Sequence, residues 1–109
     1  MDYIMGYNDY HKRIKKLAGI IKRNKSVKDI FGIPRGGLIP AAHLSYLTNL
    51  PLTGNPKTDS TAIIDDCLDS GATAHSFSNF KHFYVLIDKQ EEDIKGWIIF
   101  FWDKEFVKK

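Results

Sequence analysis

The sequence predicts an α/β domain in which a mainly parallel sheet is flanked by helices. Short apolar runs of strand length alternate along the chain with segments whose apolar residues recur at helical spacing. Turns rich in glycine or acidic residues follow several of these runs. Because parallel neighbouring strands are joined by helical crossovers, this alternation favours a parallel sheet whose ligands gather at the carboxyl ends of the strands.

Composition limits the possible classes. The chain has 109 residues, of which 43% are hydrophobic, so we expect residues 1–109 to form one globular domain. No apolar run approaches membrane-spanning length, which argues against a membrane partner. The single cysteine and the absence of a secretory signal pattern suit the cytoplasm. The net charge of +3 argues only weakly for nucleic acid and fits an anionic small ligand better.

The first helix is expected after Asn8 or Asp9, either of which can cap it. Its inward face carries apolar residues at spacings of four, three and four: Tyr10, Ile14, Leu17 and Ile21. Basic residues fill much of the remainder: Lys12, Arg13, Lys15, Lys16, Lys22 and Arg23. We interpret them as a solvated outer face. The alternative, a nucleic-acid surface, lacks the interleaved aromatic residues that such surfaces use.

A strand over 27–33 is followed by Pro34-Arg35-Gly36-Gly37 and then by a helix that begins near Leu38. Glycines let the backbone approach an anion closely, and the arginine fork suits phosphate. On its own, however, the tripeptide Arg35-Gly36-Gly37 is equally typical of an ordinary turn.

The most informative stretch is 61–73. A buried strand, Thr61 to Ile64, runs into Asp65 and Asp66, and Asp69 comes three residues later. The small residues Ser70, Gly71, Ala72 and Thr73 then open a helix, so that free amides and the helix dipole favour a phosphate. The carboxylates suit hydroxyl groups or a metal, and together these groups fit a ribose phosphate. Two alternatives are a solvated acidic turn and the helical DDxxD magnesium motif of prenyl-transferring enzymes, which Gly71 and the preceding strand oppose.

The remainder completes the alternation. Turn-forming residues fill 50–59, a helix after Thr73 is expected to carry Phe77 and Phe80 inward, and a strand covers 82–87. A last apolar run lies at 96–103. In a parallel sheet, Arg35, Asp65 and Lys89 would all lie just past strand ends, at one edge.

The stretch 61–73 resembles the 5-phosphoribosyl-1-pyrophosphate (PRPP) motif of the type I phosphoribosyltransferases, with Cys67 where an aliphatic residue is usual. The resemblance implies the Rossmann-like fold of that family with a minimal C-terminal hood. It assigns Asp65 and Asp66 to the ribose hydroxyls. It assigns the 5′-phosphate to Asp69, Ser70, Gly71, Ala72 and Thr73, and the general base to Asp69. Arg35, Gly36 and Gly37 resemble the pyrophosphate loop, where the family often has a cis peptide, here expected at Arg35–Gly36.

The C-terminal part is most similar to the bacterial xanthine–guanine phosphoribosyltransferases. Lys89 and the pair Trp97-Ile98 match the family's base-binding positions, and Trp102-Asp103 matches its ending, with Phe101 in place of the usual proline. Core packing is the alternative role for both tryptophans. The short 50–59 connection implies that the family's mobile lid loop is deleted.

The resemblance implies purine salvage: transfer of phosphoribose from PRPP to guanine, hypoxanthine or xanthine, with release of pyrophosphate. It also implies Mg²⁺, held by Asp65, Asp66 and Asp103, and a homo-oligomer, either a dimer or a tetramer. The missing lid leaves an alternative open, a non-catalytic sensor that binds PRPP or a nucleotide.

Overall fold

A computed structural model describes residues 2–103. Its helices are α1 (Tyr7–Arg23), α2 (Leu38–Thr48) and α3 (Ala72–Ser76), and its strands are β1 (Tyr3–Met5), β2 (Asp29–Gly32), β3 (Thr61–Leu68), β4 (His82–Asp88) and β5 (Ile98–Phe100). The strands β2, β3 and β4 form a parallel sheet in that order, and β1 pairs with β5 in a separate parallel ribbon. The predicted fold class, a mainly parallel sheet flanked by helices, is confirmed.

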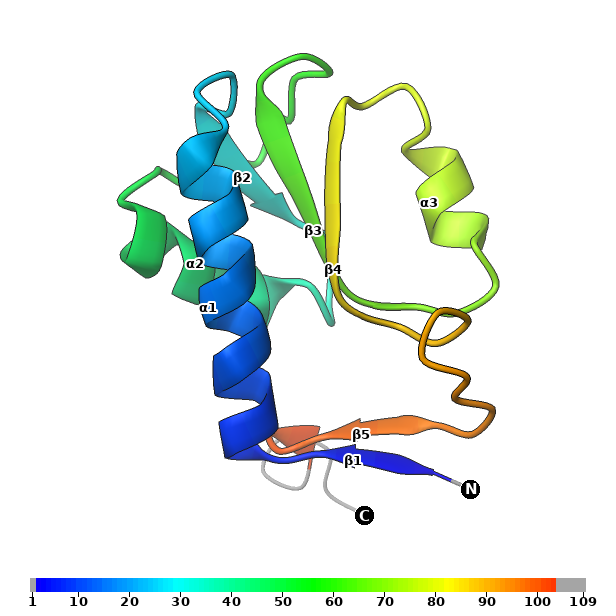
Figure 1. The fold of residues 1–109 in the computed structure, drawn as a ribbon. Helices are drawn as coiled ribbons and strands as arrows, with labels where there is room; N and C mark the ends of the chain where they lie inside the picture. Colours follow the sequence, from blue (N-terminus) through cyan, green and yellow to red (C-terminus); the bar gives the residue numbers. More distant parts are fainter. Residues whose placement is uncertain (1, 104–109) are drawn as a thin grey trace.

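The layers are unequal on the two faces of the sheet. Helices α1 and α2 lie on one face and the short α3 lies on the other, while the β1–β5 ribbon crosses near the carboxyl ends of β3 and β4 (Figure 1). The core between the sheet and the two long helices is apolar, and it includes the fully buried Ile14, Ile30, Leu44 and Ile64. In the described part of the chain, no helix is both long and apolar enough to cross a membrane.

Helix α1 begins at Tyr7, before both predicted caps. Gly6 precedes its first turn without a side-chain cap, so the expectation that Asn8 or Asp9 caps the helix is wrong. Asp9 instead lies in the first turn, where its negative charge interacts favourably with the helix dipole. Of the predicted inward residues, Tyr10, Ile14 and Ile21 are buried, and Leu17 packs at the margin of the core.

The strand β3 continues through the carboxylates instead of ending at them, contrary to the sequence prediction. Its pairing with β2 stops at Ile64, but its pairing with β4 continues until Leu68 lies opposite Asp88. A hydrogen-bonding partner on one side is enough to keep the backbone extended. One edge of β3 is therefore unpaired with β2 from Asp65 onward, and this is where the loop after β2 approaches.

Two further differences concern short elements. Helix α3 ends at Ser76, so Phe77 and Phe80 lie after it, yet both rings still pack together, and Phe77 reaches Phe31 of β2 at 6.3 Å between ring centroids. The strand β1 was not predicted, because its three residues are held mainly by pairing with β5, about 95 positions later in the chain.

The connection between α2 and β3 contains one isolated β-bridge to β2. The amide of Ile30 donates to Pro51 O at 2.9 Å, and the amide of Thr53 donates to Ile30 O at 2.9 Å, which gives a single parallel bridge at Leu52. The remainder of this connection consists of bends and turns, as its composition predicted.

Candidate active site

The two adjacent carboxylates lie on the unpaired edge of β3. Asp65 is 9% exposed, and its Oδ1 accepts the amide of Asp66 at 2.9 Å. Burial and, to a smaller extent, the neighbouring Asp65 carboxyl together raise the pKa of the Asp66 carboxyl to about 7. Asp66 therefore ionises less readily than an ordinary aspartate, because its charge would be buried and would lie beside the Asp65 carboxylate. A cation, or the hydroxyl groups of a sugar, would relieve this repulsion.

The loop after β2 packs directly against these groups. A Cβ on Gly36 would collide with the carboxylate of Asp66. A Cβ on Gly37 would meet the backbone carbonyl of Ile64 and would lie 2.8 Å from both N and O of Ile33. The loop closes through a bond from the Gly37 amide to Ile33 O at 2.8 Å. Glycine is thus required at Gly37, where the neighbouring atoms are backbone, and at Gly36 it leaves room for the Asp66 carboxylate. Arg35 is exposed beside them.

The cis peptide of this loop lies one bond earlier in the chain than predicted. The structure has it between Pro34 and Arg35, and the expectation of Arg35–Gly36 is wrong. The two glycines serve a different purpose, since their missing side chains make room for Asp66 and for the backbone of β3.

The loop after β3 is short and has a fixed turn. Gly71 has φ = 88°, a left-handed conformation that favours glycine, and its carbonyl accepts the amide of His75 at 2.9 Å. Ser70 Oγ accepts the amide of Ala72 at 3.3 Å. Because α3 has only five residues, its dipole contributes less than the sequence prediction assumed. An anion here would bind mainly through the loop amides and hydroxyl groups.

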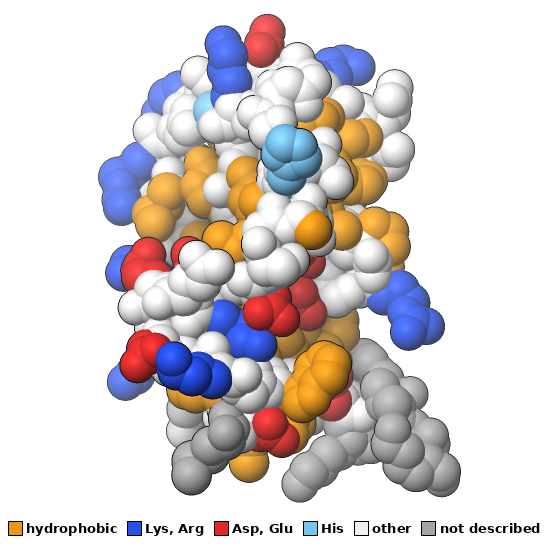
Figure 2. Space-filling model, turned by 90° about the vertical axis from the view of Figure 1, so that its right-hand side faces the viewer, with side chains coloured by type: hydrophobic (Ala, Val, Ile, Leu, Met, Phe, Trp, Pro, Cys, Tyr) orange, Lys and Arg blue, Asp and Glu red, His pale blue; other side chains and the backbone are white. Residues whose placement is uncertain are grey.

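Lys89 and Asp69 meet across the ends of β4 and β3. Lys89 Nζ lies 3.3 Å from Asp69 Oδ1, with the lysine side chain 11% exposed and the aspartate side chain 70% exposed. The backbone also joins the two segments, since the Lys89 amide donates to Leu68 O at 3.0 Å. On the face shown in Figure 2, acidic and basic side chains gather below the α3 region.

The two tryptophans have different environments. Trp102 is 7% exposed and stacks on Phe100 with ring centroids 4.6 Å apart, so it packs in the core. Trp97 is 77% exposed at the start of the β1–β5 ribbon, and its carbonyl accepts the Tyr3 amide at 2.8 Å. Ile98, the next residue, pairs with Tyr3 in register. Trp97 thus has its backbone fixed and its ring available to a planar ligand.

The three predicted metal ligands do not form one cluster. Asp103 Oδ2 accepts the amide of Phe100 at 2.8 Å, and among residues 2–103 no group of three His, Cys, Asp or Glu residues is arranged to hold a metal. Asp103 is occupied in closing the turn after β5. Asp65 and Asp66 still offer the hard oxygen donors that Mg²⁺ prefers, and Mg²⁺ commonly completes its shell with water and substrate phosphates. These two residues fit the ion if a phosphorylated ligand supplies the other donors.

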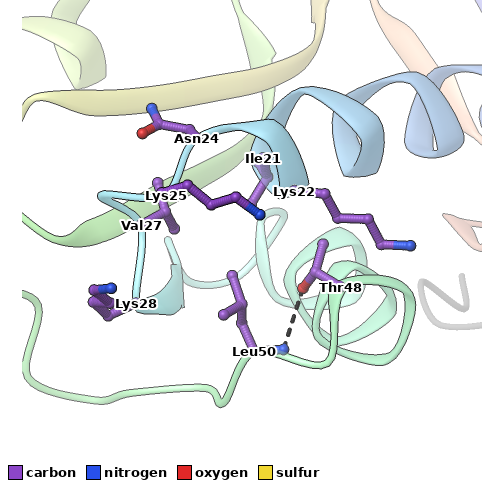
Figure 3. Close-up of a pocket in the computed structure, with 8 residues that line it drawn as sticks. All are labelled: Ile21, Lys22, Asn24, Lys25, Val27, Lys28, Thr48 and Leu50. Carbon is purple, nitrogen blue, oxygen red and sulfur yellow. Dashed lines mark hydrogen bonds between the residues drawn. The ribbon is translucent and has the colours of Figure 1, made fainter.

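A pocket of about 470 Å³ lies away from these groups, at the amino end of β2 (Figure 3). It is lined by Lys22, Lys25 and Lys28 around a floor that includes Ile21 and Leu50. Lys22 lies in the last turn of α1, where a positive charge interacts favourably with the helix dipole. None of the predicted site residues lines this pocket.

Sequence reasoning missed one half-buried charge. Arg13 was assigned to the solvated face of α1, but its side chain is 20% exposed and bonds to Asp9 and Glu92. The assignment is wrong because helical periodicity identifies the face packed on the sheet but not contacts made to a distant loop. The spacing of four between Asp9 and Arg13 was the available signal.

No protein-family model and no curated protein sequence matches this chain. Solved structures do match in fold. A purine phosphoribosyltransferase from Pyrococcus horikoshii is 20% identical with a TM-score of 0.71, covering 99% of this chain and 98% of that chain. A xanthine-guanine-hypoxanthine phosphoribosyltransferase from Helicobacter pylori is 16% identical with a TM-score of 0.70, covering 96% and 95%.

A third match is a hypothetical protein from Neisseria gonorrhoeae with bound ppGpp. It is 16% identical with a TM-score of 0.69, and the match covers 98% of this chain and 92% of that chain. At these identities the likeness concerns the fold. The chain has the α/β fold of purine phosphoribosyltransferases.

Proposed function

We propose that the protein is a purine phosphoribosyltransferase that transfers 5-phosphoribose from PRPP to a 6-oxopurine and releases pyrophosphate. One observation carries this proposal. The edge of β3 places Asp66 against Gly36 of the preceding loop, and its end places Asp69 against Lys89. Groups suited to ribose therefore lie on β3, and groups suited to pyrophosphate, 5′-phosphate and purine lie on the loops that meet its carboxyl-terminal part, as a phosphoribosyl transfer requires.

The ribose, the pyrophosphate and the 5′-phosphate of PRPP would bind along β3 and its flanking loops. Arg35, Gly36 and Gly37 would hold the pyrophosphate, with the arginine fork donating to its oxygens. Asp65 and Asp66 would accept the two ribose hydroxyls. The 5′-phosphate would bind the amides and hydroxyls of the loop from Asp69 through Ser70, Gly71, Ala72 and Thr73.

The reaction is a displacement at C1 of the ribose. A purine nitrogen forms the new bond to C1 while the bond from C1 to the pyrophosphate oxygen breaks, and the leaving group keeps the electron pair. Positive charge developing on the ribose would be offset by Asp65 and Asp66. Asp69, whose carboxylate is largely exposed, would accept the proton that the purine releases from N7. Mg²⁺ bound beside Asp65 and Asp66 would supply neutralisation of the pyrophosphate charge.

The base would be recognised by Lys89, Trp97 and the backbone at Ile98. An ammonium group has three N–H donors, so Lys89 can keep its contact with Asp69 and donate to the oxygen at purine position 6. Adenine has an amine there, which places a donor against a donor and costs a few kcal/mol, on the order of 2. The exposed ring of Trp97 can stack on the purine.

We further propose that residues 1–109 form one phosphoribosyltransferase domain, active in the cytoplasm as a homodimer or a tetramer. Sedimentation or size-exclusion measurements with light scattering would test the assembly.

A second candidate function has its own support. The connection between α2 and β3 contains only a single β-bridge at Leu52, so nothing in it resembles a long lid that would exclude water from the site. The ppGpp-bound structure with the same fold binds a phosphorylated nucleotide. A protein that binds PRPP or a nucleotide as a sensor, without turnover, would need no lid.

The test is pyrophosphate release with Mg²⁺–PRPP and each of guanine, hypoxanthine, xanthine, adenine, uracil and orotate. We expect turnover with at least one 6-oxopurine and little with adenine. Lys89→Ala should reduce the preference for 6-oxopurines over adenine by about tenfold to a hundredfold, the equivalent of one lost polar contact.

Lys81→Ala is the matched control, since Lys81 also pairs with an aspartate, at 3.6 Å, but on an exposed surface. Binding of PRPP without turnover by any base would favour the sensor. Adenine as the best substrate would contradict the assignment of Lys89.

A further inference from the structure

Arg13 lies at the meeting point of three chain segments that are far apart in the sequence. It projects from α1 and bonds to the loop after β4, to β1 and to the backbone of β4. Its contacts account for all five N–H donors of the guanidinium group. Nε donates to Asp9 Oδ1 at 2.8 Å, Nη1 donates to Glu92 Oε2 at 2.7 Å and to Leu86 O at 3.2 Å, and Nη2 donates to Glu92 Oε1 at 2.8 Å and to the Tyr3 hydroxyl at 3.2 Å.

The contact with Glu92 holds the loop that carries Lys89. The two parallel bonds between Arg13 and Glu92 fix the orientation of both groups, which single contacts between lysine and glutamate do not. The loop is compact, since the Glu92 amide donates to Asp88 O at 3.1 Å and the Ile94 amide donates to Lys89 O at 2.8 Å. A fixed Glu92 therefore fixes the backbone of Lys89.

The contact with Tyr3 reaches the other proposed base-binding residue. Tyr3 belongs to β1, and its amide donates to the carbonyl of Trp97 at 2.8 Å. The Tyr3 hydroxyl donates to Asp9, which Arg13 also binds, so the hydroxyl is held from two sides. Arg13 thus makes a hydrogen bond to the loop that carries Lys89 and another to the strand that pairs next to Trp97, the two proposed base-binding residues.

The hydrogen bonds of this cluster also keep its two carboxylates in their charged form. Glu92 holds its charged form more readily than an ordinary glutamate, because the Arg13 guanidinium lowers the pKa of its carboxyl. Asp9 is likewise held ionised by its hydrogen bonds from Tyr3 and Arg13, which outweigh the effect of burial on its pKa. The cluster stays charged and intact over the neutral range in which an enzyme works.

We propose that Arg13 is a positioning residue for base recognition, which fixes Lys89 through Glu92 and Trp97 through Tyr3. This inference rests on the proposed function, since it assigns Arg13 to the purine half of that site. In this role Arg13 itself would contact neither PRPP nor the purine. Arg13 should therefore affect the binding and discrimination of the base and leave PRPP binding, which uses β3 and its loops, unchanged.

The experiment compares Arg13→Met, Arg13→Lys and Glu92→Gln with the unaltered protein. Lys15→Met is the matched control, because Lys15 is an exposed basic residue of the same helix. We expect kcat/KM for the base to fall about tenfold to a hundredfold in Arg13→Met and Glu92→Gln, the cost of a misplaced binding group. The dissociation constant of Mg²⁺–PRPP, measured by calorimetry without a base, should stay within about twofold.

Arg13→Lys keeps the charge but loses the fork, so it should recover less than half of the loss. The double variant Arg13→Met with Glu92→Gln should be no worse than either single one, because both remove the same contact. Equal losses in PRPP and base binding, or a kcat/KM for the base that does not change, would overturn the positioning role. Arg13→Lys and Glu92→Gln keep the test decisive if Arg13→Met does not fold.

Amide hydrogen exchange separates this inference from the proposed function. Residues 89–95 and 97–98 should exchange faster in Arg13→Met and Glu92→Gln, while 61–66 in β3 should not change. An unaltered protein without turnover would contradict the proposed function, and faster exchange would then still show that Arg13 fixes both segments. Unchanged exchange at 89–95 would overturn the inference whatever the activity.

Discussion

Replacing Asp66 with asparagine should stabilise the protein at neutral and alkaline pH. In the unfolded chain an aspartate has its ordinary pKa of 3.8, whereas burial beside Asp65 raises the pKa of the folded Asp66 to about 7. The folded state thus holds a proton that the unfolded state has released. Stability must therefore decrease as the pH rises between these two values, and the ionised Asp66 destabilises the fold above them.

The size of the effect follows from the shift. About three pKa units correspond to about 4 kcal/mol if the carboxyl were fully shielded. Because Asp66 is only partly buried, water screens part of this, and we expect about 1–2 kcal/mol. Asparagine keeps an oxygen that can accept the same backbone amides but carries no charge. For a chain of this length, such a gain corresponds to about 5–10 °C in Tm.

The assay is thermal or urea unfolding between pH 4 and 9, without Mg²⁺ or phosphates, for the unaltered protein and for Asp66→Asn. The advantage of Asp66→Asn should grow between about pH 4 and pH 7 and be constant above. Glu91→Gln, which removes an exposed carboxylate, controls for the change in net charge. A difference that does not vary over this range, or a variant that is less stable at pH 8, would refute the reasoning.

Two further variants test separate parts of the site. Gly37→Ala should lower the free energy of unfolding in urea by about 3 kcal/mol or more, because the new methyl group would meet backbone atoms of Ile33 and Ile64 that cannot move aside. The control Gly54→Ala, with nothing within 4 Å, should change it by less than about 0.5 kcal/mol. Equal losses in the two variants would mean that the loop is not packed as described. Asp69→Asn should keep PRPP binding and lower kcat about a hundredfold, as loss of a general base does, and a loss of binding with unchanged kcat would exclude that role.

The sequence by itself determined the order and type of most elements. Short apolar runs of strand length and apolar residues at helical spacing are local patterns, and they identified α1, β2, α2, β3 and β4 from neighbouring residues alone. The glycines at 36 and 37 and the acids at 65, 66 and 69 were also local signals, because turn and strand-end chemistry depends on residues next to one another. Whether those residues act on PRPP stays a prediction that the proposed assays address.

The tertiary structure decided what depends on distant partners. The strand β3 extends to Leu68 because β4 is available beside it, and β1 exists because β5 pairs with it. Arg13 is held by Glu92, 79 positions later, and periodicity cannot distinguish it from the solvated lysines of α1. Trp97 and Trp102 look alike in sequence, yet one is exposed and the other buried. Burial and pairing are properties of the assembled chain, since they depend on which surfaces meet after folding.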